Sequence, residues 1–541
     1  MKNFYLITAL CAVGLLPAKG FAADLQAGNY LASRFAQSNH DWSNANKFTN
    51  KLLNADITPD NILQRSMILS MGAGNTDAAI RLAKRVKEQN SGDPNAILEI
   101  FLIAEAFKKA NYEQANSLIN SMPDDATSKF VEPFVRGWLD AAQGKLNIAN
   151  LVNSTAQLYH GILISDFLDD YTEIEKIIDK SLKIDNPNIG ELERIADLYG
   201  HVGVKDKALK LYKIVLKEIP EYESVQDKIA NLEQGKTKLL FNKITTANNG
   251  MAKAFHDIAT ILNNEQNDES ARVFANIALY LDPDINSSKF LLANISVKHK
   301  QYKAAIDYYN SISRSDEEYI NAQYEIIDIY EDTKRHDKAL ALLEALPQNT
   351  DTLIKIGDIH RGQGNFGLAL KAYDKAIEKL GGTIPKNYWH LHYVRGIAYE
   401  QLDKWSYAEK ELKAALSFQP DHPYILNYLG YAWADQGVNL EESLAMIKKA
   451  VKLRPSDGYI TDSLGWVMYR TQDYKNAVSV LEQAALLLPY DPTVNDHLGD
   501  AYWKVGRKLE AKFQWRRAVN NSKDSKQIEE IKSKLVSGIL K

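Results

Sequence analysis

Three short patterns in the chain carry residue types that can do chemistry, and the first is a glycine-rich loop. Its glycines have the spacing of a dinucleotide-binding turn: Gly362, Gly364 and Gly367. In such a turn the backbone approaches a pyrophosphate at a helix N-terminus, and a β-strand has to precede it. Helical patterns flank this loop on both sides, so its glycines relieve a bend between helices. We therefore expect no nucleotide cofactor.

Histidine and serine provide the other two patterns. His390 and His392 are separated by a single residue, and on a helix such residues point in different directions. The sequence contains no His-Glu-x-x-His and no Gly-x-Ser-x-Gly pattern. Ser463 follows an aspartate, but no histidine lies at a suggestive spacing for nucleophilic catalysis. We expect no catalytic residue, no metal site and no cofactor, and so a protein that is not an enzyme.

Composition supports a folded protein without a nucleic-acid partner. The 541 residues are 45% hydrophobic and 25% charged, which is globular, and the length exceeds one ordinary core. The formal net charge is −4, whereas nucleic-acid binding needs a basic face. We expect protein partners and no nucleic acid.

The N-terminal segment, 1–22, has the layout of a signal peptide. Lys2 precedes an uncharged apolar run over 4–16, and small residues then lead to a cleavage site between Ala22 and Ala23. The run is too short to span a bilayer as a stable helix, and no later run is long enough to do so. We expect an exported, periplasmic protein with no transmembrane segment in the mature chain. The single cysteine, Cys11, lies inside this segment and follows Leu10, unlike a lipid-attachment cysteine.

The elements that would position binding residues repeat along the chain. Four glycines recur at a nearly constant spacing of about 34 residues: Gly396, Gly430, Gly465 and Gly499. A small residue follows each glycine at a nearly constant distance, about one helix further on: Ala408, Ser443, Ala477 and Ala511. Three units end on a proline at the same phase: Pro420, Pro455 and Pro489. Small residues let two antiparallel helices pack closely, and proline ends the second helix. We call this regular series of glycine, small residue and proline the ladder, and it predicts helical-hairpin repeats.

Weaker copies of the ladder extend toward the N-terminus. The packing position of the second helix falls on Ala45, Ala79, Ala115, Ala149, Ile174, Ala208, Ala271, Ala305, Ala339 and Ala369. With the four C-terminal units, these positions predict about 14 helix pairs, which must stack because no single pair can bury its apolar face.

Interruptions of the ladder predict the domain boundaries. The largest interval runs from Ala208 to Ala271, nearly twice the usual spacing. It has room for one degenerate repeat, or for a helix plus a loop around residues 248–250. We therefore expect a degenerate array over 23–220, an irregular connection over 221–250 and a second array over 251–520. An apolar stripe within 521–541 predicts a capping helix.

The repeats resemble tetratricopeptide repeats. The family pattern is carried by Leu464, Gly465, Met468, Ala477, Leu481, Ala484 and Pro489. The segments 427–431, 462–466 and 495–503 are similar to a widespread exported bacterial repeat family, which 250–254 and 279–283 also fit. The match is specific over 250–520 and generic over 24–220. The resemblance implies an all-α solenoid, a right-handed superhelix of helix-turn-helix repeats.

The resemblance also implies a binding face. In tetratricopeptide arrays the first helix of each pair faces the concave side, at positions about three before, one after and four after the packing glycine. The candidate partner-binding residues at or beside these positions are Tyr393, Asn427, Tyr431, Asp462, Trp466, Tyr469, Asp496, Asp500 and Trp503. Aromatic residues there would provide rigid contact area and carboxylates would select partner charge. Packing between repeats is an equally open role for some of these aromatic residues.

The carboxylates restrict the partner. Chaperone-binding repeats hold a C-terminal carboxylate with lysine and asparagine at fixed groove positions. Two of the corresponding residues here are Asp462 and Asp496, which would repel a carboxylate. We expect a neutral or basic partner, or an extended or helical segment with apolar anchors.

The resemblance further suggests a role. Similar proteins include envelope adaptors, one branch of which binds a carboxyl-terminal processing protease and brings it cell-wall hydrolases. Those adaptors are lipoproteins, whereas Cys11 is not in a lipid-attachment context. We expect a scaffold or adaptor of the bacterial envelope, with an envelope protease or an assembly complex as partner. The alternative is a factor that binds peptidoglycan or another polysaccharide, since Trp and Tyr also stack on sugars, or an envelope-assembly factor.

Overall fold

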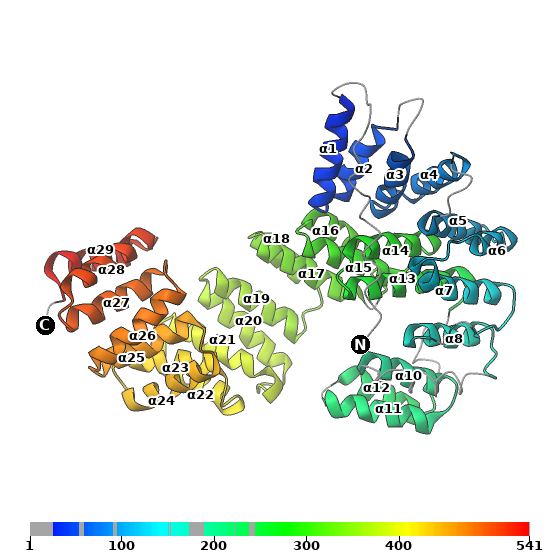
Figure 1. Cartoon of the computed structure of the whole chain (residues 1–541). Coiled ribbons are helices and arrows are strands. Elements are labelled where there is room, and N and C mark those ends of the chain that lie inside the picture. Colours follow the sequence, from blue (N-terminus) through cyan, green and yellow to red (C-terminus); the bar gives the residue numbers. More distant parts are fainter. Residues whose placement is uncertain are drawn as a thin grey trace. The chain divides into compact units, whose positions relative to one another are not determined.

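The computed structural model of the chain describes residues 25–53, 59–89, 95–149, 151, 153–172, 189–220, 222–236, 244–316 and 318–539. Every regular element in these residues is helical (Figure 1). None of the described helices has the length and apolar character needed to cross a membrane. The expected signal peptide, 1–22, and the packing position Ile174 lie outside the described residues.

Two compact units divide the chain, Met1–Ile329 and Tyr330–Lys541, and we call them the first and second unit. The first unit contains α1 (Leu25–Ser38), α2 (Trp42–Asn50), α3 (Asp60–Gly72), α4 (Thr76–Gln89), α5 (Ala96–Lys108), α6 (Tyr112–Asn120), α7 (Ala126–Ala142), α8 (Thr155–Phe167), α10 (Ile189–His201), α11 (Lys205–Glu218), α12 (Glu223–Glu233), α13 (Ala247–Asn264), α14 (Asp268–Leu281), α15 (Asn286–Lys298) and α16 (Tyr302–Asn310). Helix α17 (Glu318–Asp332) runs across the division.

The second unit continues with the most regular repeats. It contains α18 (His336–Ala345), α19 (Thr350–Gly362), α20 (Phe366–Lys379), η2 (Lys386–Tyr388), α21 (Trp389–Glu400), α22 (Trp405–Phe418), α23 (Pro423–Gln436), α24 (Leu440–Leu453), α25 (Gly458–Arg470), α26 (Tyr474–Leu487), α27 (Pro492–Lys504), α28 (Lys508–Asn521) and α29 (Ser525–Ser537).

Consecutive helices pair as hairpins, as the ladder predicts. Twelve packing positions lie in the second helix of a pair with no exposed surface: Ala45, Ala79, Ala115, Ala208, Ala271, Ala305, Ala339, Ala369, Ala408, Ser443, Ala477 and Ala511. In the first helices, a Cβ added at Gly430 would overlap Ile447, and one at Gly499 would overlap Trp515. Small residues are therefore what allows the two helices of a pair to approach.

Two sequence expectations differ from the structure. Ala149 is exposed and lies in the connection between α7 and α8, not in a helix. Residues 248–250 lie in the first turn of α13 rather than in a loop, and α12 precedes that helix. The boundary expected at 221–250 lies where the similarity between sequence repeats is interrupted, whereas the division after Ile329 separates two parts of the chain that each make most of their contacts internally. The two divisions describe different properties of the chain.

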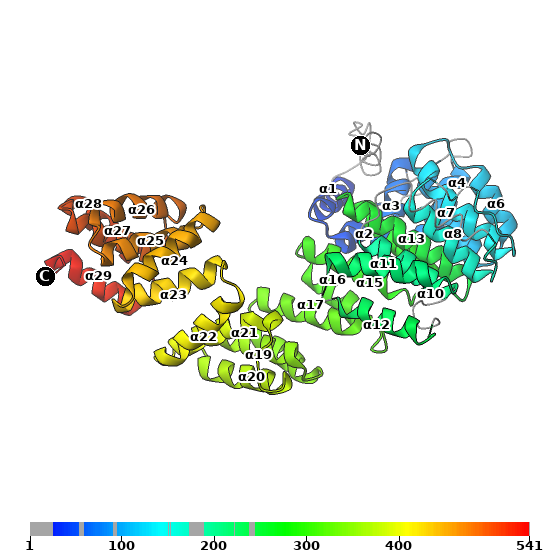
Figure 2. The ribbon, with the colours of Figure 1, turned by 90° about the horizontal axis from the view of Figure 1, so that it is seen from below.

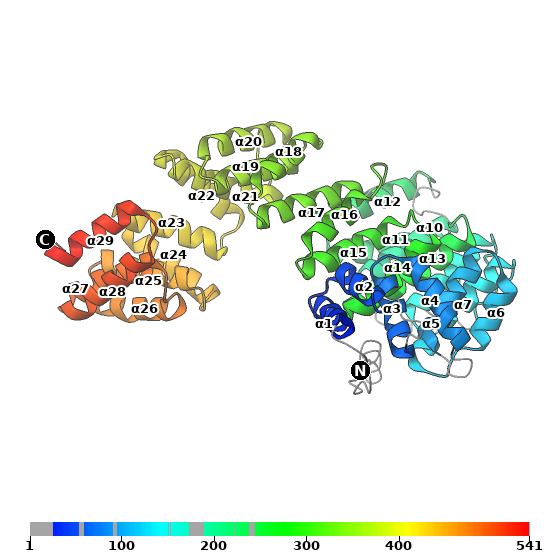
Figure 3. The ribbon, with the colours of Figure 1, turned by 90° about the horizontal axis from the view of Figure 1, so that it is seen from above.

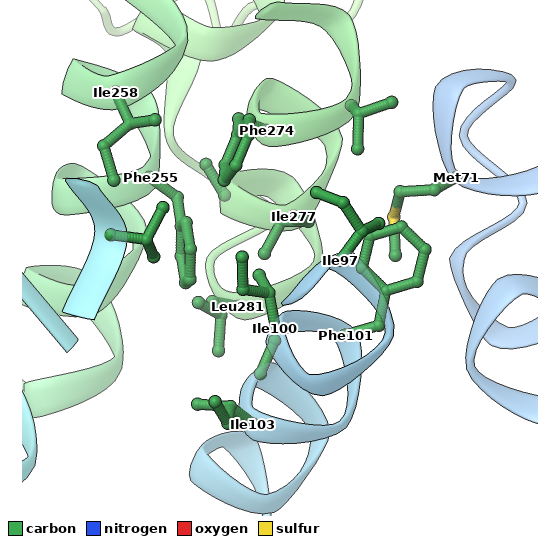
Figure 4. Close-up of a cluster of buried hydrophobic side chains, with 14 of the residues drawn as sticks. Met71, Ile97, Ile100, Phe101, Ile103, Phe255, Ile258, Phe274, Ile277 and Leu281 are labelled. Carbon is green, nitrogen blue, oxygen red and sulfur yellow. The ribbon is translucent and has the colours of Figure 1, made fainter. Parts of the chain in front are cut away.

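In the first unit, later hairpins fill the inner face of the earlier array. Helix α13 contacts α7 and α8, and α14 contacts α3, α4 and α5. Figure 4 shows Phe274, Ile277 and Leu281 of α14 directed at Ile97, Ile100 and Phe101 of α5. Residues 96–107 of α5 are all buried, because α5 has neighbours on every side. Figure 2 also shows α13 beside α3 and α7, and Figure 3 shows α14 beside α3.

Polar groups fix this packing. Asn276 donates to the backbone oxygen of Gly72, which is 204 residues away in sequence. Trp138 Nε1 lies 2.9 Å from His160 Nδ1, and His160 Nε2 lies 3.1 Å from the Asp257 carboxylate. Lys253 also pairs with Asp257. These bonds join α7, α8 and α13, so the helices hold one register.

In the second unit, the first helices of neighbouring repeats form the inner side. Helix α23 contacts α25, and α25 contacts α27, whereas the second helices make no comparable contact among the described residues. Helices that lie closer together belong to the inner side of a curved stack. The inner side is therefore lined by α23, α25 and α27 and, earlier in the chain, by α19 and α21, which also contact each other. Helix α29 packs on α28 and buries Ile531 at the C-terminal end.

Candidate partner-binding face

The predicted binding residues occupy the first helices of the second unit. Tyr393 lies on α21, Asn427 and Tyr431 on α23, Asp462, Trp466 and Tyr469 on α25, and Asp496, Asp500 and Trp503 on α27. Because residues three or four apart share a helix face, Asp462 and Trp466 point to the same side. Every tyrosine and tryptophan of the set keeps part of its surface exposed. The structure divides the set into three groups.

The first group is an aromatic corner between α21 and α23. The rings of Tyr393 and Tyr428 meet edge to face at 6.0 Å, and the Tyr428 hydroxyl donates to Glu400 at 3.0 Å. Tyr428 was not predicted, although it follows Asn427 directly. Burial and the Glu400 carboxylate raise the pKa of Tyr428, and burial also raises that of Tyr431. Both phenols stay neutral hydrogen-bonding groups.

The second group is centred on a buried Asp–His pair. His497 of α27 lies with Nδ1 2.9 Å from the Asp462 carboxylate of α25, which is 6% exposed. Trp466 stacks on His497 at 4.0 Å and on Tyr469 at 4.9 Å. Burial works to lower the pKa of His497, but Asp462 and two neighbouring carboxylates outweigh it, so this pKa is raised. The pair ties two repeats together below the aromatic surface.

Three buried polar atoms on this face have no hydrogen-bond partner in the described structure. They are Asn427 Oδ1, Asp462 Oδ1 and Trp466 Nε1. A buried polar group without a partner costs about 1–3 kcal/mol, so most proteins avoid it. Two acceptors and one donor therefore lie unused on α23 and α25, all at predicted binding positions.

The third group is engaged by the chain itself. Lys534 of α29 lies 2.8–2.9 Å from the carboxylates of both Asp496 and Asp500. Asp500 also accepts from Trp515 Nε1 at 2.8 Å. Trp503 packs against Trp515, against Lys508 and against Gly538, where an added Cβ would overlap its ring. These three predicted residues hold the capping helix in place, which leaves α23 and α25 as the available part of the face.

Besides Tyr428, sequence reasoning missed His497 and Lys534. His497 is the neighbour of Asp496, the residue that matches Asp462 in the next repeat, and it lies in the segment 495–503 that carries the family resemblance, so its place beside Asp462 could have been considered. Lys534 had no such signal, since its role depends on how α29 docks.

The first unit contains a second polar region that sequence reasoning did not identify. A cavity of about 250 Å³ lies between α8, α10 and α13, with Arg194, Tyr159 and Asp257 among its lining. Arg194 stacks on the Tyr159 ring at 5.4 Å. Burial opposes ionisation of Asp257, but Lys253 and His160 hold the pKa of its carboxyl well below its usual range. The Asp257 carboxylate is therefore already neutralised inside the protein.

Side chains that can ligate metals do not cluster in the part of the chain that the structure describes. No group of three or more His, Cys, Asp or Glu side chains there could hold a metal ion. The glycine loop that resembles a nucleotide motif joins α19 to α20, and Gly364 has a positive φ of 77°. It makes the tight turn of one hairpin.

Comparison with known proteins agrees with this repeat structure. Models of the tetratricopeptide repeat match residues 296–352, 350–378 and 393–458. The TPR repeat-containing protein PA4667 of Pseudomonas aeruginosa is 29% identical over 218 residues, which is 40% of this chain. The chain spans 36% of that relative's length.

Among solved structures, the thermophilic TPR protein TTC0263 of Thermus thermophilus is 19% identical, with a TM-score of 0.30. The superposition covers 35% of this chain and 99% of the TTC0263 chain. The APC/C hetero-tetramer Cut9–Hcn1 is 13% identical and covers 95% of this chain and 96% of its own, with a TM-score of 0.40.

The helix pairs, their buried small residues and the matched repeats define the class: the protein is an all-α tetratricopeptide-repeat solenoid. Its repeats are similar to those of a bacterial TPR repeat-containing protein. Such repeats mediate protein–protein interaction as a rule and are a typical non-catalytic scaffold.

Proposed function

We propose that this protein is a non-enzymatic adaptor of the bacterial cell envelope that binds a partner segment along α23 and α25. The observation that carries the proposal is the set of unused buried polar atoms at Asn427, Asp462 and Trp466. They lie beside the partly exposed rings of Tyr431 and Tyr469. Hydrogen-bonding capacity next to aromatic area is what a binding hot spot needs.

The contrast between the units supports this location. The inner face of α3, α5 and α7 is filled by α13 and α14 of the same chain. Within the second unit, α23 and α25 contact only helices adjacent to them in the repeat order. The second unit is therefore the place where a partner finds free inner surface.

The chemistry of the face favours a basic or neutral partner. Asp435, Asp462, Asp496 and Asp500 lie on or beside the face, and Arg470 and Lys534 are the permanent cations that pair with carboxylates there. A peptide backbone supplies N–H groups for Asn427 and Asp462 and a carbonyl for Trp466. Because the three atoms are covered in the free chain, a partner reaches them after a local rotation of side chains.

The envelope location rests on the sequence. Residues 1–22 have the layout of a signal peptide, and the repeats resemble those of exported adaptors. The partner we propose is an envelope protease or an assembly complex. Mass spectrometry of the mature N-terminus from fractionated cells tests export: a start at Ala23 supports it, and an intact Met1 contradicts it.

Site-specific photocrosslinking in living cells tests the binding face. A photoreactive phenylalanine derivative replaces Tyr431 or Tyr469 on the proposed face, and Tyr407 on the second helix α22 in a matched control. Tyr407 is 59% exposed, so it is at least as accessible as the test positions. We expect one protein to be crosslinked from Tyr431 and Tyr469 and not from Tyr407.

Equal crosslinking from all three positions, or from Tyr407 alone, would place the partner elsewhere. Peptidoglycan fragments in place of a protein at Tyr431 and Tyr469 would favour the polysaccharide alternative. Asp462→Asn should weaken protein capture about tenfold or more, because a hydrogen bond to a charged group contributes about 1.5–3 kcal/mol.

A further inference from the structure

The outward face of α28 carries an exposed apolar pair at two positions that are small or polar in the preceding second helices, although single apolar residues such as Leu486 of α26 are exposed elsewhere. Ala511, Trp515 and Ala518 face inward and are fully buried. The opposite face carries Leu509, which is 84% exposed, and Phe513, which is 59% exposed. Lys512 and Arg516 continue the same stripe, because residues three and four apart share a helix face. An apolar pair and two cations thus point away from the core.

The other repeats provide an internal control. The positions that correspond to Leu509 and Phe513 are Lys475 and Ser479 in α26, Glu441 and Ala445 in α24, Ser406 and Lys410 in α22, and Gly367 and Lys371 in α20. None of these pairs contains a large apolar residue. The exposed Leu–Phe pair is therefore a property of the last repeat and not of the repeat pattern.

Charge distinguishes the same region. Between residues 504 and 526 the chain has eight basic residues and two acidic ones, a net charge of +6, whereas the whole chain has −4. Some of these cations are engaged, since Arg507 pairs with Glu482 and Glu510. Lys504, Lys512 and Arg516 make no ion pair or hydrogen bond with any described residue. They are available to an external anion.

From this combination we propose that the outward face of α28 docks onto an anionic lipid surface. Leu509 and Phe513 enter the boundary between headgroups and acyl chains, and Lys512 and Arg516 contact lipid phosphates. A convex helix face with two protruding apolar side chains fits a flat surface. An acidic protein segment would need a groove, and the outward side of one helix does not provide one.

The proposal does not depend on the inner binding face, which α23 and α25 carry on the other side of the repeats. It implies that membrane contact and partner binding are compatible in one molecule.

Vesicle flotation of the full chain tests the proposal. The probe is large unilamellar vesicles of phosphatidylglycerol and phosphatidylcholine in a molar ratio of about three to seven, compared with phosphatidylcholine alone, at low and high salt. We expect flotation with the anionic vesicles only, weakened by salt because exposed charges are screened. Lys512→Gln with Arg516→Gln should lower partitioning about 30-fold, since each cation near an anionic surface contributes about 1 kcal/mol.

Leu509→Ser with Phe513→Ser should also lower partitioning, because both side chains leave water on insertion. The matched control is Lys371→Gln with Lys375→Gln, two exposed cations on the outward face of α20. These positions are exposed, apart from Lys512, which is partly exposed, so circular dichroism should show unchanged folding. The proposal is overturned if the chain ignores anionic vesicles at low salt, or if the α20 control loses as much partitioning. Binding to poly-L-glutamate without binding to vesicles would assign the face to an acidic protein and also overturn it.

Discussion

Gly250 gives the sharpest test of the packing that closes the first unit. It is the fourth residue of α13 and lies directly against the ring of Trp138 on α7. A Cβ at this position would overlap three ring atoms of Trp138, which is fully buried and hydrogen-bonded to His160. The ring therefore has little room to move.

Two opposing effects decide the outcome of Gly250→Ala. Replacing glycine by alanine in a helix favours folding by up to about 1 kcal/mol. Overpacking a filled core costs about 1–3 kcal/mol, and a displaced Trp138 also loses a hydrogen bond of about 1 kcal/mol. We expect a net destabilisation of about 2 kcal/mol. In a unit of this size, that lowers the melting temperature by about 3–6 °C.

Gly28→Ala is the matched control, because Gly28 is the fourth residue of α1 in the same unit and an added Cβ there meets nothing. It should leave stability unchanged or raise it by up to about 1 kcal/mol. Thermal unfolding followed by circular dichroism measures both variants. If Gly250→Ala were as stable as Gly28→Ala, then Trp138 would not be wedged against α13, and the filled inner face would be refuted.

Two further predictions concern the polar groups of the two units. Burial lowers the pKa values of His160 and His256, that of His256 to about 4. Below about pH 6.5 the folded first unit therefore binds fewer protons than its unfolded state, and its stability falls as pH falls. The raised pKa of His497 has the opposite sign: its contribution is complete below about pH 6.5 and is lost as pH rises through the folded value. Hydrogen exchange at about pH 5.5 and 7.5, corrected for intrinsic rates, should show α13 less protected and α27 more protected at the lower pH. His497→Gln should remove the pH dependence of protection in α27. Equal shifts in α13 and α27 would contradict the opposite signs assigned to these histidines. Lys534→Gln should destabilise the docking of α29 by about 1–3 kcal/mol, because it leaves Asp496 and Asp500 without their cation. The control variant Lys526→Gln, on the exposed side of α29, should change the stability of docking little. Exchange protection at the Ile531 amide measures this, and equal losses in the two variants would contradict the role of Lys534.

The repeat architecture could be predicted because it is local. Small residues such as Ala271 and Ala477 occur where two helices of a hairpin cross, and this requirement depends only on the helix that precedes them in the same pair. Ala149 fitted the interval without fitting the structure, since a long connection follows α7 and the period alone does not reveal it. Periodicity reports spacing, and a loop can have the same length as a helix.

The filled inner face could not be predicted from periodicity, because it depends on which distant hairpin docks. One signal was present in the sequence. Residues 96–107 in α5 are largely apolar on every side of the helix, and such a helix has to be buried all round. The binding positions were located by register, but register could not distinguish Trp466, on the available face, from Trp503, which α29 and its neighbours cover.

The filled inner face also governs the order in which the first unit can fold. Asn276 meets Gly72 across 204 residues of sequence. At about 5–20 residues per second, a ribosome needs roughly 10–40 s to add the intervening chain. During that time α3, α5 and α7 can form hairpins with their neighbours, yet the surfaces of Ile100 and Phe101 have no cover. The first unit therefore differs from a simple array that grows repeat by repeat. The apolar inner surface of its N-terminal hairpins stays uncovered until α13 and α14 have been synthesised.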